Sequence, residues 1–137
     1  GSGALAAATQ YVKERKQFGK AIAEFQGIQF QLAQMATDLE AARLLVLKAA
    51  WTMDERGEHG SNSRAEISLI KFAVPRITLE IIDRAIQVFG GAGVSDDWPL
   101  AEMYAHARTL HFVDGPDEVH LMQIARRELR TYEGFRT

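Results

Sequence analysis

Apolar residues recur at helical spacing along most of this chain, and the pattern predicts an all-α protein. The clearest run lies between Glu24 and Arg56, where successive apolar positions alternate between four and three residues apart. These positions, here called the seam, are Ile28, Leu32, Met35, Leu39, Ala42, Val46, Ala49 and Met53. A seam of this period favours packing against a nearly antiparallel neighbouring helix. Gly57 and Gly60 are expected to end the seam helix.

A second run with the same spacing, from Ile67 to Val88, predicts the antiparallel partner of the seam helix. Ser61 or Ser63 can cap the start of this partner helix. Glu66 stands three residues after Ser63, which is the spacing of a capping box. The two long helices are therefore expected to form the body of one bundle.

Shorter segments complete the predicted bundle. An alanine-rich helix is expected from about Ala4 to Lys16, a short helix from Pro99 to about Arg108, and a last helix from Asp114 through Leu129. The chain shows no alternating apolar and polar stretch, so no sheet is expected. We therefore expect an up-and-down four-helix bundle with short extra helices.

Composition narrows the possible functions. Of the 137 residues, 47% are apolar and 25% are charged, so the chain can bury the core of one domain. A net charge of −2 gives no footprint for nucleic acid, and no apolar run reaches the roughly 18 residues of a membrane span. The chain has no cysteine and its histidines lack metal-ligand spacing, so no metal site is predicted. The histidines are His59, His106, His111 and His120. We set aside residues 1–3 as an expression scar and expect 4–137 to be a domain from a longer protein.

Four short segments carry residues that a bundle alone does not require. They are Tyr11–Lys20, Phe25–Gln29, Ala85–Gly93 and Phe112–Val119. Singly, they can be explained as a charged helix end, a core aromatic, a glycine helix stop and a helix cap. In this order they resemble the motifs of the acyl-CoA dehydrogenases, and the resemblance covers essentially the whole chain. It implies a C-terminal helical-bundle domain of an FAD-dependent enzyme that dehydrogenates an acyl-CoA thioester at its α and β carbons.

The first three segments supply most of the FAD contacts that the resemblance implies. In the family pattern Y-x-x-x-R-x-x-F-G, the positions of Arg15, Gln17 and Phe18 meet the FAD of a neighbouring subunit, and a guanidinium suits a pyrophosphate. The pattern Q-x-x-G-G-x-G places Gln87 and Gly91 at FAD, where glycine lets backbone approach a phosphate closely. Further implied FAD contacts are Ile22, Phe25, Ile28 and Val88.

The fourth segment resembles the family's x-x-E-G-T motif, whose glutamate removes the α-proton of the substrate. The acid in this chain is Asp114, which is therefore the implied catalytic base. Val113 and Gly115 are the implied substrate contacts, while Pro116 and Glu118 stand where the family has FAD-contacting Thr and Gln. We expect the carboxylate to act as a base only when it is shielded from water.

The resemblance also implies partners. They are FAD, an acyl-CoA substrate, an electron-transfer partner such as electron transfer flavoprotein, and further copies in a dimer or tetramer. The compartment would be cytoplasmic in a bacterium, and mitochondrial or peroxisomal in a eukaryote. Two alternatives remain open: a non-catalytic helical assembly domain and a related flavoprotein oxidase. Asp114 argues against the first, because a bundle that needs only stability more often holds an apolar residue there.

Overall fold

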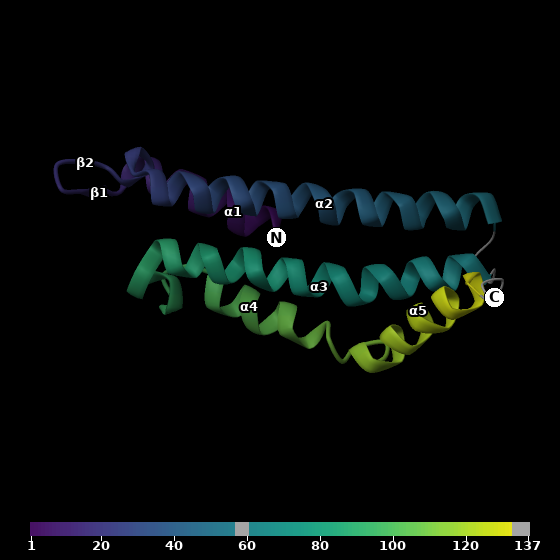
Figure 1. The fold of residues 1–137 in the computed structure, drawn as a ribbon. Coiled ribbons are helices and arrows are strands. Elements are labelled where there is room, and N and C mark those ends of the chain that lie inside the picture. The colour runs from purple at the N-terminus through teal and green to yellow at the C-terminus, as the bar shows by residue number, and fades with distance from the viewer. Residues whose placement is uncertain (57–60, 133–137) are drawn as a thin grey trace.

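Two long antiparallel helices form the body of the protein. The computed structural model describes residues 1–56 and 61–132. Figure 1 shows α2 (Gln26–Arg56) lying alongside α3 (Ser61–Phe89), with the chain reversing direction between them. The other helices in this part of the chain are α1 (Ser2–Glu14), η1 (Ile22–Glu24), η2 (Gly90–Val94), α4 (Leu100–Thr109) and α5 (Asp117–Thr131). The predicted helix ends at Gly57 and Gly60 lie outside the described residues.

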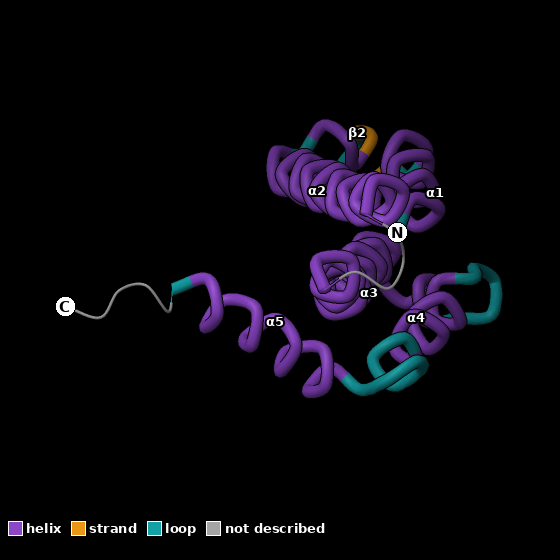
Figure 2. Tube along the Cα trace, turned by 90° about the vertical axis from the view of Figure 1, so that its right-hand side faces the viewer, coloured by secondary structure: helices purple, strands orange, loops and turns teal. Residues whose placement is uncertain are grey.

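Helix α3 lies at the centre of the fold. Figure 2 shows α1 and α2 on one side of α3, and α4 and α5 on the other. The buried side chains between them are Ala4, Ala8, Met35, Ile81, Ile82, Ala85, Phe89, Leu100 and Ala107. Among the described helices, none is both long and apolar enough to cross a membrane. The predicted all-α bundle is confirmed.

Burial along α2 follows the predicted seam. Met35, Ala42 and Ala49 are buried, whereas Val46 remains 43% exposed. The other seam residues are half-buried. Apolar spacing therefore identified the face of α2 that turns toward the rest of the bundle, because burial on a helix repeats with the same period as its side chains.

The expectation that the chain contains no sheet is wrong. A two-residue antiparallel ladder pairs β1 (Lys16–Gln17) with β2 (Lys20–Ala21). The ladder is too short to leave an alternating pattern in the sequence. Phe18 and Gly19 connect the strands with φ values of +53° and +80°, and positive φ at both central residues is what a type I′ hairpin turn requires.

The capping box predicted at Ser63 and Glu66 is also wrong. Helix α3 begins at Ser61, so Ser63 lies inside the first turn. The Glu66 carboxylate instead lies 3.1 Å from the Lys48 ammonium of α2 and 3.2 Å from the Arg127 guanidinium of α5. Because Glu66 is buried, these two cations offset the cost of removing its charge from water. Glu66 therefore links three helices.

Two helix starts differ from the expectation in ways that matter for the site. Helix α1 begins at Ser2 and so includes residues that the sequence analysis set aside. Helix α5 begins at Asp117, after Pro116 in an extended conformation, rather than at Asp114. Asp114 is consequently a loop residue.

Two neighbouring glycines offer a test of the packing at the end of α3. A Cβ on Gly93 would lie 2.7 Å from the Ile86 carbonyl oxygen and 2.9 Å from the Ile86 Cα, so helix backbone would have to shift. We expect Gly93→Ala to lower the free energy of unfolding by about 1–3 kcal/mol, measured by urea denaturation with circular dichroism.

Gly91→Ala is the matched control, because a Cβ there would meet nothing within 4 Å. Its stability should be unchanged or raised by up to about 1 kcal/mol. Equal stability of the two variants would contradict the close packing of Gly93.

Candidate functional site

The first predicted FAD contacts lie on the exposed hairpin of residues 16–21 and at Arg15, the C-cap residue of α1 that precedes it. Arg15 and Gln17 are exposed, and Phe18 at the turn is 93% exposed. The Phe18 ring meets the Phe25 ring edge-on, with 6.2 Å between centroids, and the Lys20 ammonium lies 4.3 Å from the Phe25 centroid. A bulky residue at positive φ costs roughly 1–2 kcal/mol. The hairpin thus holds an aromatic ring in solvent at a cost in stability.

The chain enters α2 through η1, and the next predicted contacts lie in η1, just after it and in the first turn of α2. Ile22, Phe25 and Ile28 are half-buried, so each side chain is partly covered by the bundle and partly open to solvent. The Glu24 carboxylate accepts a hydrogen bond of 3.2 Å from the backbone N–H of Ala21, which ties η1 to the second strand of the hairpin.

The third predicted segment forms the end of α3 and η2, here called the glycine turn (Gly90–Val94). Gly90 has a φ of +64°, and the surroundings of Gly91 are open. Gln87 is exposed, whereas Val88 is buried. An exposed glycine backbone leaves room for the close approach of a phosphate. Val88 can meet a cofactor only through its backbone unless the bundle opens.

Aromatic stacking places the hairpin and the glycine turn at the same end of the bundle (Figure 1). The Tyr11 ring, in the last turns of α1, stacks on the Phe89 ring at the end of α3, with 4.0 Å between centroids. Trp98 meets both rings edge-on, at 6.3 Å from Tyr11 and 4.7 Å from Phe89. Arg15 follows Tyr11 by four residues, and Gly90 follows Phe89 directly. The packed rings of Tyr11, Phe89 and Trp98 therefore hold the end of α1, which leads into the hairpin, against the end of α3, which leads into the glycine turn.

The predicted base lies on the Asp114 loop (residues 110–116), which connects α4 to α5. Asp114 is exposed with a φ of +58°, and Gly115 follows with a φ of +102°. Among the described residues, Asp114 and Phe18 are the non-glycine positions with positive φ. Both are predicted site residues. Backbone strain of this kind concentrates at functional sites.

Side chains from two helices fix the peptide groups on both sides of Asp114. The Lys71 ammonium of α3 donates to the Val113 carbonyl at 2.5 Å and to the Leu110 carbonyl at 2.7 Å. On the other side, Nε2 of His120 in α5 lies 3.3 Å from the carbonyl oxygen of Asp114 itself. The peptide groups before and after Asp114, which together orient its side chain, are therefore both fixed by side-chain contacts.

A contact between His111 and Asp117 joins the two ends of the Asp114 loop. His111 Nδ1 lies 2.5 Å from the carboxylate of Asp117, which stands in the first turn of α5, where the helix dipole favours negative charge. The contacts of Lys71, His111 and His120 were not predicted from the sequence. The two histidines flank Asp114 in sequence and could have been noticed, whereas the Lys71 contacts span 39 and 42 residues.

The surroundings of Asp114 in this chain are open. Phe112 is 59% exposed and Val113 is 49% exposed, so the expected shielding from water is not supplied by these neighbours. Figure 1 also shows the hairpin at one end of α3 and the α4–α5 connection beside the middle of α3. The structure therefore brings the predicted FAD contacts of the first three segments to one end of the bundle, whereas Asp114 lies apart from them. The other two predicted FAD contacts, Pro116 and Glu118, are exposed and follow Asp114 closely.

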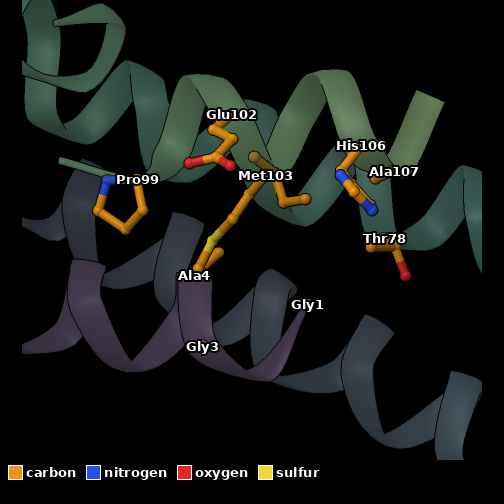
Figure 3. A pocket seen from close by; sticks show the side chains of 10 residues that line it. Gly1, Gly3, Ala4, Thr78, Pro99, Glu102, Met103, His106 and Ala107 are labelled. Atoms are coloured by element: carbon orange, nitrogen blue, oxygen red, sulfur yellow. The ribbon is translucent and has the colours of Figure 1, made fainter. Parts of the chain in front are cut away.

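Two further features of the described chain were considered as sites: a cavity and clusters of metal-ligating residues. A cavity of about 470 Å³ lies between α1, α3 and α4, and none of the predicted site residues lines it. Figure 3 shows Met103 of α4 reaching toward Ala4 of α1 across this cavity, with Glu102 and His106 on the same helix. No group of three or more His, Asp or Glu residues in the described ranges is placed to hold a metal, and His59 lies outside those ranges.

Comparison with known proteins gives a consistent result. The family profile described as "Acyl-CoA dehydrogenase, C-terminal domain" matches residues 2–129. The chain is 50% identical over 117 residues to acyl-CoA dehydrogenase family member 11 of Rattus norvegicus, a match that covers 85% of this chain and 15% of that protein.

Solved structures agree with these sequence matches. Butyryl-CoA dehydrogenase from Megasphaera elsdenii superimposes with a TM-score of 0.88 at 36% identity, over 94% of this chain and 33% of that chain. A glutaryl-CoA dehydrogenase in complex with glutaryl-CoA gives a TM-score of 0.84 at 36% identity, over 99% of this chain and 34% of that chain. The chain spans about a third or less of the length of these relatives.

The strained turn of the hairpin can be tested by stability measurements. Because Phe18 has a φ of +53°, Phe18→Gly should raise the free energy of unfolding by up to about 1 kcal/mol relative to wild type. Phe18→Ala is the control, since it removes the ring but keeps the Cβ that causes the strain, and it should give no such gain. A gain of equal size in both variants would assign the effect to the exposed ring and not to the backbone.

Proposed function

Because this chain belongs to the acyl-CoA dehydrogenase family, whose C-terminal domain it forms, we propose that it serves an FAD-dependent enzyme that introduces a double bond between the α and β carbons of an acyl-CoA thioester. The observation that carries the proposal is Asp114, an exposed carboxylate held at positive φ by hydrogen bonds to the backbone on both sides of it. Aspartate is one of the non-glycine residues that adopt positive φ most readily, and contacts on both sides of it fix the backbone that carries its carboxylate, as a general base requires.

In this proposal Asp114 is the general base. Its carboxylate removes a proton from the carbon next to the thioester carbonyl, and the proton stays on the carboxylate oxygen. FAD, when bound, supplies the acceptor for the hydride that leaves the β carbon. Val113 and Gly115 border the base and would contact the acyl group. Parts of the longer protein would have to cover the loop, because a base of this kind works best where water is excluded.

The described residues fit FAD at the hairpin and the glycine turn. The exposed Arg15 guanidinium can meet a pyrophosphate through paired donors, and the exposed Phe18 ring can stack on a ring of the cofactor. Gln87 and Gly91 offer an amide side chain and an open backbone. At the Asp114 loop the fit is poorer, since Pro116 has no N–H or hydroxyl to donate, and Glu118 brings negative charge.

The separation of these segments from Asp114 supports an assembly of several copies. A cofactor held at the hairpin of one chain would need the Asp114 loop of another chain to complete its site. Helix α2 also exposes apolar side chains that lie outside the seam. Their exposed fractions are Phe30 64%, Leu44 58%, Leu47 64% and Trp51 61%. Burying these side chains against a second copy would remove apolar area from water, so we propose a homodimer or homotetramer.

The role of Asp114 can be tested in the full-length enzyme by flavin bleaching with butyryl-, octanoyl- and palmitoyl-CoA. Asp114→Asn should slow flavin reduction by at least about 100-fold, because the amide cannot take the proton. Asp114→Glu should keep some activity with a changed order of substrates, since its oxygens lie farther out by roughly 1.5 Å. The fold should persist in both, because the Asp114 side chain is exposed and exposed substitutions usually change stability by less than about 0.5 kcal/mol.

Two results would point to another function. Wild-type rates in Asp114→Asn would leave the aspartate as a structural residue and favour a base elsewhere or a non-catalytic assembly domain. Faster turnover with oxygen than with electron transfer flavoprotein would favour a related flavoprotein oxidase. The proposal expects electron transfer flavoprotein, or a dye that replaces it, to be the efficient acceptor.

The proposed assembly predicts that the 137-residue chain associates at micromolar concentration. Leu47→Glu combined with Trp51→Glu should shift the sedimentation coefficient toward that of a monomer, because charges would have to be buried in the contact. Leu129→Glu is the control, since Leu129 is 72% exposed but lies on α5. Wild-type sedimentation as a strict monomer would be evidence against this surface.

A further inference from the structure

We propose that Lys71 is a positioning residue that holds the Asp114 carboxylate in its reactive orientation. This inference rests on the proposed role of Asp114 as the base. The Lys71 ammonium donates to backbone carbonyls and not to the Asp114 carboxylate, so it acts through the backbone that carries Asp114.

The two carbonyls that Lys71 binds determine how Asp114 is presented. The Leu110 carbonyl belongs to the end of α4, and the Val113 carbonyl belongs to the peptide that leads into Asp114. A bond to the second carbonyl fixes the peptide plane before Asp114 and hence its φ. His120 holds the plane after Asp114 and hence its ψ. An ammonium has three donors, so one lysine can serve both carbonyls at once.

The conformation of Asp114 explains why such a constraint is needed. A φ of +58° is unfavourable for a residue with a Cβ, and the next residue, Gly115, can adopt many backbone conformations. Without an external constraint the loop would relax toward commoner conformations, and the carboxylate would move with it. Strained residues persist only where the surroundings fix them. A displacement of about 1 Å at a reacting group can lower a rate about 100-fold.

The location of Lys71 suits this task. It lies on α3, the helix that packs against every other α-helix in the described part of the chain, so its backbone is well fixed. Its side chain is half-buried, and among the described residues it forms no ion pair with a carboxylate. Lys48 serves as a comparison. Its ammonium pairs with the Glu66 carboxylate at 3.1 Å and does not contact the Asp114 loop.

The test compares Lys71→Met, Lys71→Arg and Lys48→Met in the full-length holoenzyme. Lys71→Met should lower kcat by about 10- to 100-fold with little change in KM, because binding persists while the base is misplaced. Hydrogen exchange of a peptide covering residues 109–117 should become faster, with no change in a peptide from α2. Lys71→Arg, which keeps a charged donor, should give intermediate values of both quantities. Lys48→Met should leave both at the wild-type level, even if the melting temperature falls.

The outcomes separate this inference from the proposed function. If Asp114→Asn is slow but Lys71→Met matches wild type in kcat and loop exchange, the role of Lys71 is overturned and the base stands. If Asp114→Asn reduces flavin at the wild-type rate, both proposals fail. If Lys71→Met does not fold, Lys71→Arg decides, and wild-type kcat with wild-type loop exchange in that variant would overturn the role. A loss of kcat of the same size in Lys48→Met would show general destabilisation instead.

Discussion

The fold depends on the burial of α3. An apolar helix of 29 residues cannot remain in water on several faces, and here each side is covered by different partners. Helices α1 and α2 cover one side, and α4 and α5 cover the other (Figure 2). Each candidate site segment is a connection between helices that pack on α3 or is the end of α3 itself. The positions of these segments therefore follow from how the other helices dock on this one.

Strain marks the two segments to which the candidate chemistry is assigned. Phe18 and Asp114 lie at opposite ends of the sequence, yet both adopt a backbone conformation that residues with a Cβ avoid. Each is kept there by its surroundings: a two-residue ladder around Phe18, and side chains of neighbouring helices around Asp114. In the first case an aromatic ring is held in solvent, and in the second a carboxylate is. Both arrangements cost stability, which is easier to understand for a protein that binds something at these positions.

The sequence predicted features that depend on local pattern and missed those that depend on distant contacts. The 3/4 spacing from Ile28 to Met53 predicted α2 and its buried face, because side-chain burial and helix geometry share one period. The pairing of Glu66 with Lys48 and Arg127 could not be predicted, since it joins three helices whose docking no local pattern specifies. The type I′ turn at Phe18 was missed because phenylalanine is an unusual residue at positive φ. The candidate site residues came from motif resemblance, and their grouping in space came only from the structure.

Helix α3 provides a packing surface and also fixes the distance between the two candidate sites along its axis. Lys71 and Gln87 are sixteen residues apart on one continuous helix, which corresponds to roughly 24 Å along its axis. One of these residues holds the loop of the proposed base, and the other belongs to the proposed cofactor-binding end. An inserted residue between them would move the two positions apart by about 1.5 Å and rotate one relative to the other by about 100°. If both proposed sites act in one reaction, the number of residues in this part of α3 sets the spacing between them.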